Sequence, residues 1–416
     1  MTRGASSSPS TSSDADARDV ARGSRRVRVR ACGRVCLLGE HSDWAAPLAV
    51  AVDNGRSEDA DAFGEGACVV VGTSEGLDAV AWRMDRVDAM DGANEITTEA
   101  SRECGFRFVA TSVSSTEKLD CDVSNDGALE RVAAEGGFWS YVAGTALEVF
   151  REHPECRAGG LRVDIHSCSL PTKKGLSSSA AVCVLIVRAF AQVYGLKDLA
   201  RTEREMELAY RGEALRTPSK CGAMDQACAY GERVVLLRFP SSGGVTVEEV
   251  AVGADIHILV ADLGAAKNTV RILDDLQRAF RNRHVGLREA LGKRNREHVE
   301  AALHAIKLGD AGELGRIYDS AQAVFDAVGP ELCPTELVAP ALHDALTSVK
   351  RDVPHTIHGG KGVGSQGDGA VQFVCTSESA VDELRQYLTR YSAGRIHSFV
   401  VVRLAKNCVV AGAYSL

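Results

Sequence analysis

The chain has 416 residues, of which 45% are hydrophobic and 25% charged, and its formal net charge is −8. These are the values of a globular protein, and the length exceeds what one hydrophobic core usually supports, so we expect two domains. The negative charge argues against a nucleic-acid surface. The sequence contains no run of about 20 apolar residues, so we expect no membrane-spanning helix.

The first 25 residues are mainly Ser, Ala, Arg and Asp, with almost no large apolar side chain. Such a segment buries too little surface to offset the entropy of ordering, so we predict a disordered tail over residues 1–25. An organellar transit peptide is the alternative, because residues 1–13 are rich in serine and contain no acid. Asp14, Asp16 and Asp19 oppose that alternative.

After the tail, predicted strands and helices follow one another without a regular alternation, which indicates an α+β fold. Residues 84–135 are polar and rich in Ser and Asp, so we expect loops or an insertion there. Apolar residues with a period of two predict a strand over 26–38. The other predicted strands are at 69–71, 161–166, 257–262, 371–375 and 399–404, and the predicted helices are 136–150, 178–194 (closed by Gly195), 200–215 and most of 270–308.

The 13 cysteines are scattered along the chain, and no two of them form a CxxC pair. Cys32 and Cys36 share a predicted strand, but no second cysteine or histidine pair completes a zinc site. We therefore expect reduced structural thiols and a cytoplasmic protein.

The first predicted strand ends in a turn that is rich in polar side chains, namely Glu40, His41, Ser42 and Asp43. A carboxylate accepts hydrogen bonds from hydroxyl groups, and a neutral imidazole both donates and accepts. This turn at the end of a buried strand therefore predicts a binding site for a polyhydroxylated ligand. A buried histidine with a purely structural role is the alternative for His41.

A second polar segment lies between a predicted strand and an apolar helix. Gly175 lets the backbone approach a ligand closely, and the following helix N-terminus attracts anions. The serines offer hydroxyls to a phosphate or Mg²⁺, and the lysines offer positive charge. The spacing is not that of a Walker A loop, and an N-capped helix is the alternative. The segment reads Lys173, Lys174, Gly175, Leu176, Ser177, Ser178, Ser179.

Two acidic residues follow at a spacing of twelve, Glu213 and Asp225. Gly212 precedes the first, and a glycine inside a helix costs about 1 kcal/mol relative to alanine. Gly212 therefore marks close packing or an approaching ligand. Read singly, Glu213 is a solvated side chain and Asp225 a helix N-cap.

A third segment, 357–369, is rich in glycine, and we expect its first glycines to close over the site. A flexible loop is the alternative. Asp368 would be unfavourable near a triphosphate unless it points away or meets a metal ion.

Together, the three segments resemble the signature motifs of the GHMP kinase superfamily, which includes galactokinase and the homoserine, mevalonate and phosphomevalonate kinases. Asp43 and the triplet Met224-Asp225-Gln226 are most similar to galactokinase and related sugar-1-kinases. The resemblance implies a ribosomal S5 domain 2-like N-terminal domain over 26–250 and a ferredoxin-like C-terminal domain over 251–416. ATP and substrate would bind between them.

The resemblance also implies site roles and a reaction. Asp225 would be the catalytic base with Arg34 beside it. Ser179 and Glu213 would coordinate Mg²⁺, residues 173–179 would bind ATP, and the turn 40–43 would bind substrate.

The implied reaction is ATP-dependent phosphorylation of a sugar, at its anomeric hydroxyl, by a monomer or homodimer. Mevalonate or homoserine kinase and a catalytically silent sugar sensor are the alternatives. Expected partners are thus ATP, Mg²⁺ and a small-molecule sugar, with no nucleic acid and no membrane.

The chain departs from the galactokinase pattern after Asp43, where residues 44–47 replace the usual glycine. Galactose is therefore the first expectation, with arabinose, a uronic acid and fucose close behind. A uronic acid would require an additional cation in the pocket, which the motifs do not locate.

Overall fold

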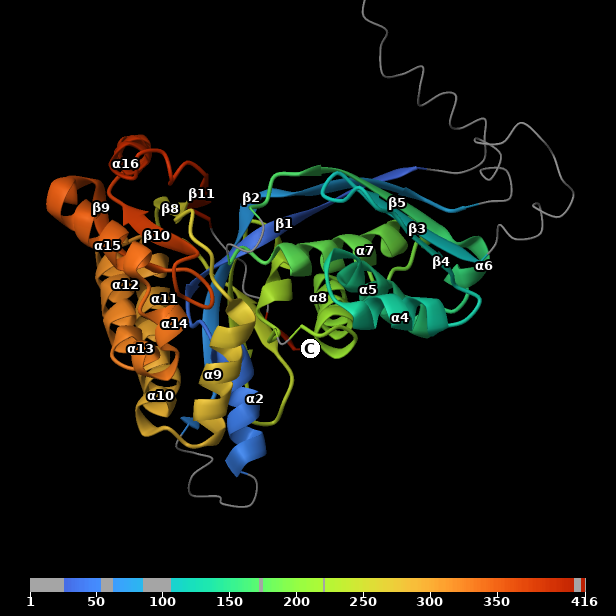
Figure 1. Ribbon diagram of the computed structural model, residues 1–416, viewed down its shortest axis with the longest axis horizontal. Helices are drawn as coiled ribbons and strands as arrows, with labels where there is room; N and C mark the ends of the chain where they lie inside the picture. Colours follow the sequence, from blue (N-terminus) through green and yellow to red (C-terminus); the bar gives the residue numbers. More distant parts are fainter. Residues whose placement is uncertain are drawn as a thin grey trace, which may run out of the picture.

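The computed structural model describes residues 26–53, 63–84, 106–171, 175–219, 221–407 and 413–415. The predicted tail 1–25 and the two lysines Lys173 and Lys174 lie outside the described residues. Two β-sheets with their helices lie side by side, and the long strands β1 (Val27–Leu38) and β2 (Gly66–Trp82) extend from one towards the other (Figure 1). The mixed α+β fold is confirmed, whereas the domain boundary after residue 250 stays a prediction.

The first sheet is organised around β2, because three strands pair with it. β1 pairs with β2 in an antiparallel manner along the whole length of β1. β5 pairs with residues 77–82 of β2, and β6 pairs with residues 66–71 of β2. The strand order is β12-β7-β6-β2-β5-β3-β4, with β1 added to β2. The remaining strands are β3 (Arg107–Ser112), β4 (Leu119–Asp122), β5 (Leu161–Cys168), β6 (Val234–Phe239), β7 (Thr246–Glu249) and β12 (Ala413–Ser415).

Helices of the N-terminal half cover one face of this sheet (Figure 1). The most buried is α7 (Ser178–Tyr194), which ends as predicted where Gly195 takes a left-handed conformation, with φ 68°. A π-helical turn, η3 (Arg211–Leu215), continues α8, and a 3₁₀ helix, η4 (Asp225–Tyr230), follows. The other helices are α2 (Ser42–Asp53), α4 (Gly127–Glu135), α5 (Phe138–Glu152), α6 (Cys156–Gly159) and α8 (Thr202–Tyr210).

The second sheet has the order β11-β8-β10-β9 and is antiparallel throughout. Because side chains alternate along a strand, Ile258 and Val260 face one core while Leu259 and Ala261 face another. The helices α11 and α12 pack in the first of these cores, and α15 and α16 in the second. The strands are β8 (Ile256–Asp262), β9 (Ile357–Gly362), β10 (Ala370–Cys375) and β11 (Phe399–Leu404).

The C-terminal half is mainly helical, as the sequence predicts for 270–308. A π-helical turn, η5, interrupts this stretch. The helices are α9 (Thr269–Arg281), α10 (Val285–Glu289), η5 (Ala290–Arg294), α11 (Asn295–Leu308), α12 (Ala311–Asp326), α13 (Gly329–Leu332), α14 (Pro334–Leu337), α15 (Pro340–Asp352), η6 (Pro354–Thr356) and α16 (Glu378–Tyr391).

Two sequence expectations are wrong. Residues 84–135 do not hold only loops, because β3, β4 and α4 lie within this range and β3 pairs in parallel with β5. The first glycines of 357–369 neither close over the site nor form a flexible loop, because they belong to strand β9. Asp368 points away from the loop, as one expectation required, and accepts a hydrogen bond from the backbone N–H of Leu342 (2.9 Å) at the start of α15.

Neither a membrane-spanning helix nor a disulfide bond is found in the described part of the chain. None of its helices is long and apolar enough to cross a membrane. Its cysteines are all free thiols, as expected.

The glycines of β9 allow helix α12 to pack directly against the strand, and this generates a prediction. A Cβ atom on Gly359 would lie 2.0 Å from the carbonyl oxygen of Gly315 in α12. Gly359→Ala should therefore lower the free energy of unfolding by about 3 kcal/mol or more, measured by urea denaturation. In Gly127→Ala the new Cβ would meet only the ends of two side chains, Asn125 at 3.2 Å and Arg131 at 3.7 Å. This control should change stability by less than about 1 kcal/mol, and an equal loss in both variants would contradict the packing explanation.

Candidate active site

Arg34 lies at a bulge in β1, between Cys32 and Arg34 in the pairing with β2. A side chain at Gly33 would collide with the carbonyl oxygen of Leu176 (2.8 Å), so the bulge brings the predicted phosphate-binding segment close to β1. Arg34 Nη1 donates to the carbonyl oxygen of Gly175 (2.6 Å), and its backbone N–H donates to that of Leu176 (3.1 Å). The guanidinium is buried and joins this segment to the first strand.

Arg34 also forms an ion pair with Asp225, the first residue of η4. Burial opposes its charged form, but the carboxylate of Asp225 outweighs burial and raises the pKa of Arg34 above its usual value. Asp225 caps no helix, and its side chain stays 20% exposed. The two residues predicted to be catalytic are thus in direct contact, and the carboxylate remains accessible.

Glu213 lies in η3, where the wider helical turn redirects the chain after α8. Its side chain is buried and accepts a hydrogen bond from Gln226 Nε2 (2.8 Å) and another from Ser179. Burial and the nearby Asp225 raise the pKa of Glu213 to about 7. It is therefore not a solvated side chain. Its contact with Ser179 brings together the two predicted metal ligands.

Gly212, beside Glu213, marks close packing. A Cβ atom there would lie 2.5 Å from the Cα of Thr145 in α5. The glycine therefore lets η3 lie directly against α5, which is the first of the two interpretations that the sequence offered.

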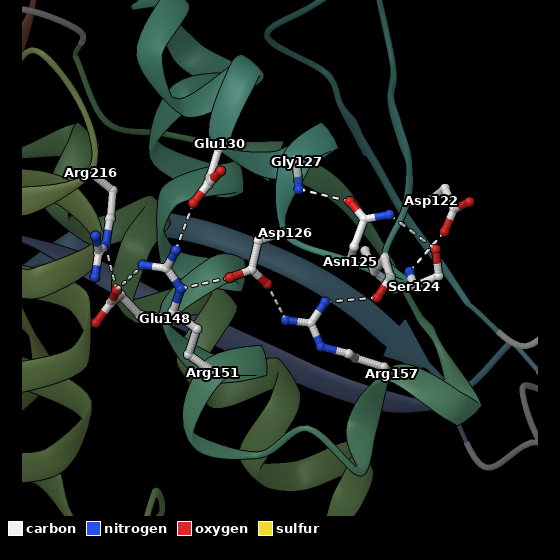
Figure 2. Close-up of polar contacts among 11 residues, drawn as sticks. Asp122, Ser124, Asn125, Asp126, Gly127, Glu130, Glu148, Arg151, Arg157 and Arg216 are labelled. Carbon is white, nitrogen blue, oxygen red and sulfur yellow. Dashed lines mark hydrogen bonds and ion pairs between the residues drawn. The ribbon is translucent and has the colours of Figure 1, made fainter.

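A buried carboxylate, Glu148 of α5, holds η3 in place. It forms ion pairs with Arg211 (2.6 Å) and Arg216, which flank Glu213 in sequence. Figure 2 shows the contacts continuing through Arg151 to Asp126 at the start of α4. Since breaking a buried pair costs several kcal/mol, this network fixes the position from which Glu213 points at Ser179.

The predicted phosphate-binding segment has a strained backbone. Ser177 adopts a left-handed conformation (φ 54°) that is costly for a residue with a side chain. Its hydroxyl oxygen is buried and has no hydrogen-bond partner among the described residues. The turn that follows β9 lies against this segment, because Gly364 approaches Gly175 and a Cβ on Gly175 would meet Val363 at 3.2 Å. Leu176 is buried, and Ser178 and Ser179 open α7.

His41 is held as a neutral donor. Its Nδ1 accepts a hydrogen bond from Trp44 Nε1 (3.0 Å), so the proton is assigned to Nε2. Nε2 is buried and has no partner in the part of the chain that the structure describes. Burial, Lys267 and Lys361 together lower the pKa of His41 to about 3. A buried donor without an acceptor points to a ligand as its partner.

Asp43 and Ser42 differ in what they offer a ligand. The Ser42 hydroxyl accepts from Asn295 Nδ2 (2.7 Å) and so is bound to α11. Asp43 packs against Gly222, whose Cβ would lie 2.2 Å from its carboxylate. In the described part of the chain, its carboxylate accepts only from the backbone N–H groups of Met224 (3.4 Å) and Trp44 (3.1 Å).

The ionised form of Asp43 is consequently destabilised by its surroundings. Burial, with a contribution from Asp225, raises the pKa of Asp43 to about 6. A hydroxyl-bearing ligand would supply donors to this group.

Glu40, the fourth predicted substrate residue, already has a partner that sequence reasoning missed. Lys361 of β9 is 1% exposed and forms an ion pair with Glu40. A single signal in the sequence pointed to it, namely a lysine inside the run of glycine and apolar residues 359–364.

The oxygen ligands fit a magnesium ion that arrives with a nucleotide. Among the described residues, no group of three or more His, Cys, Asp or Glu side chains can hold a metal by itself. Mg²⁺ is commonly bound by one or two carboxylates together with substrate phosphates. Glu213, the hydroxyl of Ser179 and the unpartnered hydroxyl of Ser177 are ligands of this kind.

Comparison with known proteins identifies a family resemblance. Residues 140–232 match the family model for the GHMP kinases N terminal domain. A curated mevalonate kinase of Aeropyrum pernix is 28% identical over 173 residues, which is 38% of this chain and 47% of that protein. The chain thus spans about half the length of this relative.

Solved structures resemble the whole fold. The crystal structure of L. major mevalonate kinase in complex with R-mevalonate has a TM-score of 0.63 at 15% identity and covers 93% of this chain and 98% of its own. Lactococcus lactis galactokinase complexed with galactose also has a TM-score of 0.63, at 16% identity, covering 94% and 95%. The resemblance to the GHMP kinase superfamily is confirmed, and the chain has its two-domain fold.

The raised pKa of Asp43 predicts a gain in stability on neutralisation. A carboxyl whose pKa is higher folded than unfolded destabilises the fold when ionised, so the penalty is full above about pH 6 and disappears towards pH 4. Asp43→Asn should raise the free energy of unfolding at pH 8 by about 1–2 kcal/mol, after allowing for one lost hydrogen bond. Urea denaturation at pH 8 and pH 4.5 measures this difference.

Asp53 supplies the control, because it is also buried but pairs with Arg283 and Arg288. Asp53→Asn should destabilise the protein by a few kcal/mol, because it removes the buried carboxylate that pairs with both arginines. If Asp43→Asn is also less stable at pH 8, the surroundings of Asp43 do not destabilise its ionised form.

Proposed function

We propose that the protein is an ATP-dependent kinase that phosphorylates a hydroxyl of a neutral sugar, at the anomeric position as in galactokinase. The observation that carries this proposal is the Arg34–Asp225 pair, which lies between the segment 175–179 and the acidic turn 40–43. A group placed there touches both the phosphoryl donor and the acceptor.

The reaction needs little covalent chemistry from the protein. The acceptor oxygen attacks the γ-phosphorus in line, the bond from that phosphorus to the β,γ-bridging oxygen breaks, and ADP leaves. Asp225 takes the proton of the attacking hydroxyl, and the Arg34 guanidinium stabilises the negative charge that develops beside it. Mg²⁺, bound with the nucleotide by Glu213 and Ser179, would neutralise phosphate charge.

The charges around the acceptor support an uncharged polyol. Asp225 lies close enough to Asp43 and to Glu213 that its negative charge contributes to the raised pKa of each of them. A substrate carboxylate in this cluster would be repelled. Lys361 is the extra cation that a uronic acid would require, but Glu40 already neutralises it. The proposal therefore names a neutral sugar before a uronic acid.

Mevalonate phosphorylation is the second candidate, and a specific finding favours it. A curated relative is a mevalonate kinase, and so are three of the similar structures. Asp43 distinguishes the two candidates, since it would accept hydrogen bonds from sugar hydroxyls but repel a carboxylate. A silent sensor of sugar and ATP is a third possibility, against which the buried ligand Glu213 and the base Asp225 both argue.

An assay of ADP release with Mg²⁺-ATP tests the proposal against free sugars, uronic acids, mevalonate and homoserine. We expect release with one or more neutral sugars and none with mevalonate or homoserine. Turnover of mevalonate alone would replace the sugar proposal by the second candidate. Silence across the panel with intact ATP binding would support the sensor.

The role of Asp225 predicts a loss of turnover in Asp225→Asn. Removing a general base costs about 10²- to 10⁴-fold in kcat, whereas acceptor binding should weaken only modestly. Steady-state kinetics and calorimetric titration measure the two effects. Asp78→Asn is the control, because Asp78 also pairs with an arginine, Arg30, but in an exposed position. It should keep wild-type kcat, and a kcat near wild type in Asp225→Asn would remove the residue from the base role.

A further inference from the structure

Lys361 occupies an unusual position for a lysine, and the proposed reaction does not use it. Within the described residues, it and Arg34 are the buried cations. Its ammonium pairs with Glu40 Oε1, donates to the carbonyl oxygen of Gly362 (3.1 Å) and lies 5.4 Å from the centre of the Tyr318 ring. Burying such a pair costs desolvation energy, so stability alone is a weak reason for it.

The pair connects the two sheets at the point where the substrate turn begins. Glu40 follows β1 of the first sheet, and Lys361 lies in β9 of the second. A second polar contact runs alongside, because Gln372 of β10 donates to the carbonyl oxygen of Cys36 (2.9 Å). The end of β1 is thus fixed by side chains of the second sheet.

The surroundings of Glu40 make Lys361 the source of its compensating charge. Tyr318 of α12 has its pKa raised by burial and by Glu40 and is neutral, as is His41. His298 of α11 shares a small cavity with Glu40, and burial lowers its pKa as well. Lys267, the next cation, bonds instead to the backbone oxygens of Val363 and Gln366.

That cavity, of about 40 Å³, is lined by Glu40, His41 and Lys361 among others and has room for little more than water. Without Lys361, the buried carboxylate of Glu40 would lose the cation that fixes its position. An acceptor substrate would then lose a well-placed oxygen that accepts its hydrogen bond.

We propose that Lys361 is a positioning residue for the acceptor site: its ion pair holds the carboxylate of Glu40 in the place from which it would bind the substrate. This inference rests on the proposed kinase function, but not on which acceptor is phosphorylated. Lys361 itself need not touch the substrate.

Lys361→Met tests the proposal against Lys361→Arg, on whichever acceptor the wild type phosphorylates. In Lys361→Met the KM for the acceptor should rise about 10- to 100-fold, as for one lost hydrogen bond to a charged group, while the KM for ATP stays within about twofold. Lys361→Arg keeps the cation and should bring the acceptor KM back to within a few-fold of wild type. Equal losses for ATP and acceptor, or no rescue by Lys361→Arg, would overturn the proposal.

A second comparison covers the case in which Lys361→Met does not fold. Glu40→Gln and Glu40→Gln/Lys361→Met both lack the buried carboxylate, so the second change should cause no further loss of acceptor kcat/KM. A further loss of tenfold or more would show that Lys361 acts independently of Glu40.

Thermal unfolding keeps the test separate from the proposed function. If the wild type phosphorylates nothing, the proposed function fails, but Lys361→Met should still unfold at a lower temperature than wild type, because it removes the cation of a buried carboxylate. Glu40→Gln/Lys361→Met should recover part of that loss, because it removes the carboxylate as well. An equal loss in the single and the double variant would contradict the assigned role for Lys361.

Discussion

The buried guanidinium of Arg34 is the interaction on which the site depends. It binds the carbonyl oxygen of Gly175, and it pairs with Asp225. One side chain thus connects the predicted phosphate-binding segment, the first strand and the proposed general base, which are far apart in sequence. A lysine has neither the fixed fork of donors nor the weak hydration that makes burial tolerable, so this position selects arginine.

The acids around that cation are held in a state that a ligand would relieve. Asp43 and Glu213 are buried, and their pKa values are raised to about 6 and about 7. Glu213 accepts hydrogen bonds from Gln226 and Ser179, while Asp43 relies on backbone N–H groups. Such groups reduce stability in the absence of ligand, and active sites are where proteins keep them. The arrangement favours a divalent cation at Glu213 and hydroxyl donors at Asp43.

Much of this was predictable from sequence wherever a local rule determined the outcome. The apolar sequence of 178–194 predicted a helix, and Gly195 predicted where this helix ends. The alternation of apolar and polar residues predicted the strand over 26–38. The strands β3 and β4 were hidden because their apolar residues are few and their pairing with β5 is non-local. The role of Lys361 was not predicted for the same reason, because no residue near it in the sequence indicates a contact with Glu40. Only the packing of the second sheet against β1 brings the two charges together.

The glycine-rich segment shows why a motif alone does not fix a residue's task. Its first glycines are needed because β9 and α12 approach backbone to backbone, as the contact between Gly359 and Gly315 shows. Gly364, later in the same segment, lies against Gly175. Each of these two glycines is needed because another backbone approaches it closely. For Gly359 that backbone belongs to helix α12, and for Gly364 it belongs to the candidate ligand-binding loop at Gly175. Since the strand that packs on α12 also carries Lys361, the same run of residues fixes the second sheet, the phosphate-binding segment and the substrate turn relative to one another.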